Sequence, residues 1–289
     1  MSTMKMGILL LALLLAACGS AKSGASEHAG HGQAQGQAKT EGHSAGAEGH
    51  GEHTGASQPA ADTQVVWKLN PEQPQAGQDT QVSMEVRDAK GEPVEKFDTN
   101  HEKLMHLIVV SKDLSYFDHL HPAYEGKGRF DITTKLPAGG EYKLFADYVP
   151  AGGSATTGSE WVKAEGTAPA ARPLEPDSQL TRTVEGKEVT LTTGTLAAGQ
   201  EVMLTFHLSD AETKQPIRNL EPYLGAVGHV VILDAAAEQY LHVHPVDEKA
   251  TGPEAQFMTT FPKSGTYKIW GQFQQSGRTF IVPFTVKVG

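Results

Sequence analysis

The chain is poor in cysteine and in clustered basic residues. Its 289 residues include one cysteine, Cys18, so neither an intramolecular disulfide nor a cluster of thiolate ligands can form. Acidic residues outnumber basic ones and the formal net charge is −10, whereas binding to nucleic acid requires clustered lysine and arginine. The sequence also lacks a nucleophile elbow, a phosphate-binding loop and a dinucleotide fingerprint. We therefore expect no nucleic-acid partner and no enzyme of these classes.

Long apolar runs are absent except near the N-terminus. Lys5 precedes the run ILLLALLLAA, which is too short for a permanent transmembrane helix, and the small residues LAAC end at Cys18. This order is that of a signal peptide, and its end resembles the bacterial lipobox, which implies that Cys18 is lipidated. We predict a lipoprotein outside the cytoplasm, anchored in the cell membrane or the outer membrane. The alternative is an ordinary cleaved signal with an incidental cysteine.

The segment after Cys18 is rich in glycine, alanine, serine and glutamine and has no large aliphatic or aromatic residue up to Asp62. Such a composition buries too little apolar surface to offset the entropy lost on ordering, so we predict a disordered tether. A flexible chain with imidazoles and carboxylates can collect zinc or copper weakly, although a plain hydrophilic spacer is the alternative. The five histidines of this tether are His28, His31, His43, His50 and His53.

The rest of the chain contains an internal repeat. AGQDTQVSMEVRD at 76–88 matches AGQEVMLTFHLSD at 198–210, and LPAGGEYKLFADY at 136–148 matches FPKSGTYKIWGQF at 261–273. These short runs alternate apolar and polar residues, and turn-forming residues separate them. The pattern is typical of two copies of an immunoglobulin-like sandwich of roughly 100 residues each.

We therefore predict an all-β fold with two tandem immunoglobulin-like β-sandwich domains after a disordered His-rich tether. A Pro-rich, polar stretch between the copies, TAPAARPLEPDSQ, is typical of a linker. The predicted order is lipoprotein signal peptide, tether, first sandwich, linker and second sandwich, at residues 1–17, 18–62, 63–166, 167–181 and 182–289.

Three histidines recur at the same spacing in both copies. The first copy has them in the run LMHLIVVSKDLSYFDHLHP and the second in GHVVILDAAAEQYLHVHP, with offsets of 13 and 15 residues from the first histidine. Most residues between them differ, so the spacing is what the duplication has kept. The two sets are His106, His119 and His121, and His229, His242 and His244.

Each set fits one end of an antiparallel hairpin. If the two runs of the first copy pair around a turn near 112–114, either His119 or His121 lies opposite His106, because the register with Leu120 opposite would expose the apolar face. The remaining histidine then lies diagonally, at about 7–8 Å between Cβ atoms. The prolines that follow, Pro122 and Pro245, cannot donate to a ladder and should end the strands beside a loop. Three imidazoles can therefore reach one point.

Three neutral imidazoles suit Zn(II) or Cu(II) and leave one coordination position open. Copper ranks above zinc in affinity for nitrogen ligands, but supply can reverse that order. The first copy offers two further candidate ligands, Met105, whose thioether favours Cu(I), and His101, where the second copy has Gly228 and Leu224. The alternative is a polar network in which the histidines hydrogen-bond to one another or to the backbone.

The M/G-H strand, the HLHP and HVHP ends and the Gly-Thr/Glu-Tyr-Lys strand resemble bacterial envelope proteins with YtkA-like domains, which are sandwiches akin to the CopC copper-resistance fold. The resemblance covers about residues 63–289. It implies a role outside the cytoplasm in handling heavy metals and brings no established catalytic residues. The CopC copper site does not carry over, because its N-terminal histidine has no counterpart in a mature chain that starts at lipidated Cys18.

We predict a lipid-anchored metal-binding protein, with copper or alternatively zinc as its ion, that buffers, delivers or resists the metal through one three-His site per domain. Its expected partners are metal ions, the membrane and another envelope protein that handles metals. The alternative is an envelope scaffold with structural histidines. A zinc hydrolase is the third hypothesis; Glu102 and Asp118 lie near the histidines in sequence, but neither copy has an obvious paired carboxylate. We therefore predict that the protein is not an enzyme.

Overall fold

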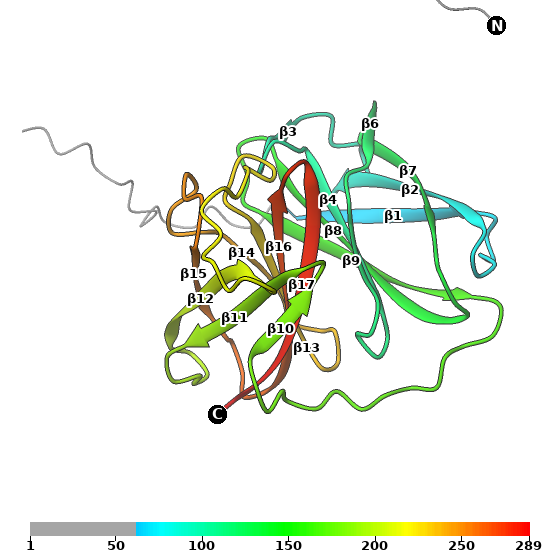
Figure 1. Cartoon of the computed structure of the whole chain (residues 1–289). Helices are drawn as coiled ribbons and strands as arrows, with labels where there is room; N and C mark the ends of the chain where they lie inside the picture. Colours follow the sequence, from blue (N-terminus) through cyan, green and yellow to red (C-terminus); the bar gives the residue numbers. More distant parts are fainter. Residues whose placement is uncertain (1–61) are drawn as a thin grey trace, which may run out of the picture. The chain divides into compact units, whose positions relative to one another are not determined.

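The computed structural model describes residues 62–289, which belong to one compact unit. The predicted signal peptide, its Cys18 and the tether with its five histidines lie outside the described residues. Over 62–289 the secondary structure is entirely strands and turns, which confirms the predicted all-β fold with two repeated sandwich domains (Figure 1). In this range no helix is long and apolar enough to cross a membrane.

The first domain consists of two antiparallel sheets. One has the order β1-β2-β7-β6 and the other the order β3-β8-β4-β5, with β9 also paired to β8. The strands are β1 (Thr63–Asn70), β2 (Asp79–Asp88), β3 (Phe97–Asp98), β4 (Met105–Ser111), β5 (Phe117–Leu120), β6 (Ala123–Gly126), β7 (Arg129–Lys135), β8 (Gly140–Pro150) and β9 (Thr156–Ala164).

The second domain repeats this plan with the sheets β10-β11-β12-β15 and β14-β13-β16-β17. The repeated segments found in the sequence fall on equivalent strands, β2 with β12 and β8 with β16. The strands are β10 (Thr181–Val184), β11 (Lys187–Thr193), β12 (Glu201–Asp210), β13 (His229–Asp234), β14 (Tyr240–Val243), β15 (Glu254–Thr260), β16 (Gly265–Gln275) and β17 (Arg278–Val288).

Burial along the strands separates two kinds of sheet. Strands β1 and β15 alternate between more buried and more exposed residues, as expected where one face packs on the core and the other meets solvent. In contrast, β4 and β13 are buried at almost every position. Each of these two strands must therefore be covered on both faces.

The second covering layer of β4 and β13 comes from the other domain. Odd residues of β4, such as Leu107, belong to the core of the first sandwich, whereas Ile108 and Val110 belong to a separate apolar cluster. That cluster also contains Val231 and Leu233 of β13. The outer faces of the sheets β8-β4-β5 and β16-β13-β14 thus pack on each other, and we call this cluster the interdomain core.

Aromatic pairs show that the interdomain packing has approximate twofold symmetry. Phe117 of the first domain stacks on Trp270 of the second at 4.7 Å between ring centroids. The equivalent residue of the second domain, Tyr240, stacks on Phe145 of the first at 5.1 Å. Each domain therefore contributes the same two positions to the interface, as in an isologous dimer.

Candidate functional site

Both hairpins place their histidines in the same register. In the first, Leu107 lies opposite Leu120, so the next pair towards the open end is His106 and His121. In the second, Val230 lies opposite Val243, which sets His229 against His244 in the same way. Of the two registers that the sequence left open, both domains adopt this one. β5 and β14 end at Leu120 and Val243, two residues before the prolines.

The three predicted histidines of the first domain lie together. Each of His106, His119 and His121 offers a ring nitrogen, and the three nitrogens lie within 4.8 Å of one another. Their ring centroids are 4.8 to 5.2 Å apart. His106 and His119 are buried and His121 is half-buried. We call these residues the first triad.

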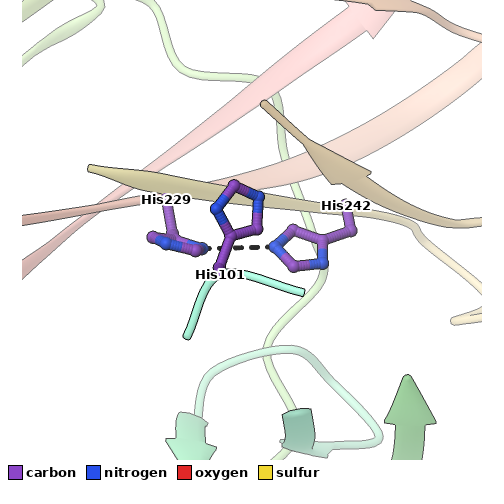
Figure 2. Close-up of side chains that lie close together, drawn as sticks. All are labelled: His101, His229 and His242. Atoms are coloured by element: carbon purple, nitrogen blue, oxygen red, sulfur yellow. Dashed lines mark hydrogen bonds between the residues drawn. The ribbon is translucent and has the colours of Figure 1, made fainter. Parts of the chain in front are cut away.

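The second compact set differs from the sequence prediction. The histidines whose ligand atoms lie within 4.8 Å of one another are His101, His229 and His242, so a residue of the first domain replaces His244 (Figure 2). The ring of His101 lies 4.4 Å from that of His229 and 5.5 Å from that of His242. His244 is not lost from the cluster, because its Nδ1 contacts Nε2 of His101. We call His101, His229 and His242 the second triad.

Met105 does not join the histidines. Consecutive residues of a strand point to opposite faces, and Met105 packs in the core of the first sandwich while His106 points to the other face. Its thioether is 1% exposed and packs among apolar side chains. Met105, which the sequence suggested as a copper ligand, thus lies in the core of the first sandwich, on the face of β4 opposite to His106. His101, the other ligand that the sequence suggested, lies beside histidines of the second domain.

The inner nitrogens are oriented by partners from the opposite domain. His119 donates its Nδ1–H to Oε1 of Gln272 at 2.6 Å, and His242 donates its Nδ1–H to Oδ2 of Asp147 at 2.7 Å. Asp147 and Gln272 occupy equivalent positions on β8 and β16. A metal-binding histidine commonly donates its other ring nitrogen to such a partner, which fixes the tautomer and directs the free lone pair.

These outer bonds direct ring nitrogens towards one another inside the first triad. His106 donates Nε2–H to the carbonyl oxygen of Asn100 at 2.9 Å, so its Nδ1 is unprotonated in the neutral ring. Nε2 of His119 is unprotonated for the same reason, yet these two atoms face each other at 2.9 Å. With Oε1 of Gln272 as the acceptor, both nitrogens present lone pairs to the space between them, and a metal ion could use both; with the amide turned so that Gln272 donates, His119 would instead donate Nε2–H to Nδ1 of His106. Two nitrogens bound tetrahedrally to one zinc-like ion would lie about 3.3 Å apart, close to this geometry.

Burial makes a proton an unsuitable cation for this position at neutral pH. It lowers the pKa of His106 from 6.5 to about 4 and holds the pKa of His119 well below its usual value. Burial likewise lowers the pKa of His121 to about 4, and burial with repulsion from His244 lowers the pKa of His101 to about 3. Neutral imidazoles are the form that binds metal ions.

Two further nitrogens are buried without a partner. Among residues 62–289, Nε2 of His121 and Nε2 of His229 are inaccessible and accept or donate no hydrogen bond. An unsatisfied buried polar atom is costly and calls for an explanation such as an ion. Burial also lowers the pKa of His229 far below its usual range. The donor set of neutral nitrogens with oriented lone pairs fits copper or zinc.

Sequence reasoning missed Asp147 and Gln272. Both lie in the repeated strand, at the third position of FADY and of WGQF, so the repeat contained a weak signal. Their role depends on how the two domains pack, which alternation along a strand does not reveal. Glu102 and Asp118, the two carboxylates noted near the first histidines, have other contacts: Glu102 lies over Gly225, and Asp118 accepts a hydrogen bond from Tyr116.

The similar solved structures described next share little sequence identity with the chain. The Escherichia coli adhesin FdeC is 15% identical with a TM-score of 0.27, over 81% of this chain and 66% of its own. The outer capsid protein Hoc of bacteriophage RB49 is 11% identical with a TM-score of 0.22, over 78% and 59%. Two fibronectin type III domains of chicken tenascin are 14% identical with a TM-score of 0.23, over 78% and 100%. The chain thus spans less than two thirds of the first two, and likenesses at this level carry no information on function.

Sequence comparison identifies the repeated domain. No curated protein matches the chain. The resemblance to YtkA-like and CopC proteins stays a prediction. One family model, described as a domain of unknown function, DUF8832, matches residues 60–166 and again residues 182–289. Because these two matches cover most of the chain, the protein belongs to the DUF8832 family and carries two tandem copies of its domain.

Proposed function

We propose that this protein binds copper, or alternatively zinc, through the histidine cluster between its two domains. The single observation that carries the proposal is the convergence of the ring nitrogens of His106, His119 and His121, which lie within 4.8 Å of one another. A metal ion bound between them would take one lone pair from each neutral ring. The buried orphan nitrogens of His121 and His229 support the same conclusion.

The cellular setting follows from the sequence. We propose that Cys18 carries a lipid that anchors the protein outside the cytoplasmic membrane, and that the upstream histidines collect ions for the cluster. Buffering, delivery or resistance to copper are the functions that fit such a protein, with another envelope metal-handling protein as the donor or acceptor. The resemblance to YtkA-like proteins points in the same direction.

Binding, rather than catalysis, is favoured by the chemistry around the histidines. The nearest buried carboxylate, Asp147, is already held by His242 and by the hydroxyl of Tyr240. A hydrolase with a three-His zinc needs a free general base beside the bound water. We therefore propose that the protein is not an enzyme.

The test is metal uptake by the full chain, purified in mild detergent, with the five tether histidines changed to alanine so that only the cluster is measured. Metal content and thermal stability are followed with Cu(II), with Cu(I) under reductant and with Zn(II). We expect bound metal and a raised melting temperature, because an ion that binds only the folded state stabilises it by mass action. His119→Ala combined with His242→Ala should abolish both effects.

His207→Ala is the matched control. This histidine lies on β12, outside the cluster, and bonds to Thr192 at 2.9 Å. Its loss should leave metal uptake unchanged. Equal uptake by the parent and by the double variant would overturn the proposal, and the histidines would then be a hydrogen-bonded network that joins two domains of a scaffold protein.

A further inference from the structure

The two triads are in contact with each other. Rings of different triads approach closely, with centroids 5.3 Å apart for His106 and His242, 5.9 Å for His119 and His229, and 6.0 Å for His106 and His229. These separations are close to those inside each triad. The histidines of the two domains therefore form one continuous cluster, at one end of the interdomain core.

His101 reaches the second domain from a tight turn. Asn100 and Lys103 exchange two backbone hydrogen bonds, and the residues between them, His101 and Glu102, have φ values of 45° and 62°. Two consecutive residues with positive φ are the mark of a type I′ turn, which glycine and asparagine adopt most easily. Strain of this kind persists where surrounding structure determines it and is often linked to function.

The equivalent turn of the second domain lies directly against this one. Tyr223 and Ala226 also exchange two backbone hydrogen bonds, around Leu224 and Gly225, which have positive φ values. A Cβ on Gly225 would lie 3.4 Å from Oε1 of Glu102, so the two turns touch. Leu224 stands at the position of His101, and it cannot bind a metal. Symmetry is broken here, because only the first domain sends a histidine across.

We propose that the seven histidines form one two-ion centre, in which the second ion is held by both domains through His101, His229 and His242, so that loading the centre locks the two sandwiches together. This inference rests on the proposed metal binding. It makes His101 an interdomain ligand and gives His244 the role of a neighbour that contacts His101. Two separate sites, one in each domain, would instead require His244 as a ligand.

The experiment compares two single variants in the full chain with the tether histidines changed to alanine. His101→Asn removes the imidazole but suits the positive φ of this turn, so the fold should be kept. His244→Ala removes the ligand that a site within the second domain would need. Each protein is loaded with Cu(I) under reductant or with Cu(II), and bound copper per chain is counted by native mass spectrometry.

We expect two copper ions in the parent chain, one in His101→Asn and two in His244→Ala. Loss of an ion in His244→Ala with retention of both in His101→Asn would overturn the inference while leaving metal binding intact. One ion in the parent chain would also overturn it. No copper in any of the three proteins would overturn this inference together with the copper form of the proposed function.

Two further measurements test whether the two ions lie close enough to interact, and whether metal loading holds the two domains together. Close Cu(II) ions interact magnetically, so the doubly loaded parent should give an EPR signal weaker or broader than twice that of singly loaded His101→Asn. Copper should also slow amide exchange at Ile108 and Val231 of the interdomain core in the parent by at least tenfold, and by less in His101→Asn. Additive EPR spectra and equal exchange protection would rule out a shared centre.

Discussion

The two copies of the domain place the same side chains in the same positions but surround them differently. His119 of the first domain donates to Gln272, a neutral amide, whereas His242 of the second donates to Asp147, a carboxylate that Tyr240 also holds. Phe117, which has no hydroxyl, stands at the position of Tyr240. The interface thus has two equivalent places: one contains the carboxylate of Asp147 and the hydroxyl of Tyr240, and the other contains the amide of Gln272 and the ring of Phe117.

The copies have therefore diverged at the hydrogen-bond partners of the hairpin histidines, while the three histidines of each hairpin are the same in both copies. A carboxylate partner raises the basicity of a ligating imidazole more than an amide does, because it stabilises the positive charge that the ring shares with the ion. We therefore expect the second triad to bind a metal ion more tightly than the first.

The first prediction concerns the two symmetric aromatic pairs of the interdomain core. Trp270→Ala and Phe145→Ala each remove a buried ring at equivalent positions of the interdomain core, so each should lower the free energy of unfolding by about 3–5 kcal/mol. Denaturant unfolding of the metal-free chain measures this. Val66→Ala, a half-exposed residue of β1, is the control with a small effect. Losses below about 1 kcal/mol would mean that the domains do not depend on this packing.

The second prediction concerns pH. In the folded metal-free protein, burial holds the pKa values of His106 and His121 at about 4, below the 6.5 of the unfolded chain. As pH falls below 6.5, these two histidines become protonated in the unfolded chain but stay neutral in the folded protein. Stability should be complete above pH 6.5, decrease down to about pH 4, and then level off for these two residues.

For His106 alone the slope reaches about 1.4 kcal/mol per pH unit. Urea unfolding with a chelator present, repeated between pH 7.5 and pH 4, measures it. The double variant His106→Gln with His121→Gln removes both groups and should reduce the slope. An equally steep curve in that variant would assign the pH dependence to other residues, such as His119, whose pKa burial also lowers.

The third prediction exchanges the outer partners. Asp147→Asn and Gln272→Glu keep the shape of each side chain and change only its charge. Asp147→Asn should weaken copper binding at the second triad about tenfold to a hundredfold, and Gln272→Glu should strengthen it at the first triad by a comparable factor. Competition titrations with a chromophoric chelator measure both affinities. In the double variant the order of affinities should reverse, and an unchanged order would show that the partners do not set it.

Much of the fold was predictable because it depends on local patterns. The alternation in the repeated segments predicts β2, β8, β12 and β16, and the offsets of 13 and 15 residues predict the grouping of His106, His119 and His121 in the first hairpin. Even the register was narrowed to two choices, since a slip by one residue would expose an apolar face. Period and turn chemistry are properties of short segments, and a single sequence contains them.

The remainder of the site was not predictable because it depends on packing between domains. The full burial of β4 indicated a second covering layer only once the structure showed the matching face of β13. The sequence suggested His101 as a ligand within the first domain, whereas it lies beside His229 and His242 of the second. It also suggested Met105, whose side chain packs in the core of the first sandwich. At the equivalent position, a Cβ on Gly228 would lie 2.5 Å from the carbonyl oxygen of Gln272, so no ligand could have been kept there in both copies.

The reciprocal stacks of Phe117 on Trp270 and Tyr240 on Phe145 have an evolutionary consequence. A chain with a single copy could build the same interface only by pairing with itself, and each half would then have to carry identical residues. Fusion of two copies removes that requirement. One half could then keep a carboxylate where the other has an amide, and one turn could carry a histidine where its twin carries Leu224. Duplication in a single chain thus permits an asymmetric centre that a homodimer cannot encode.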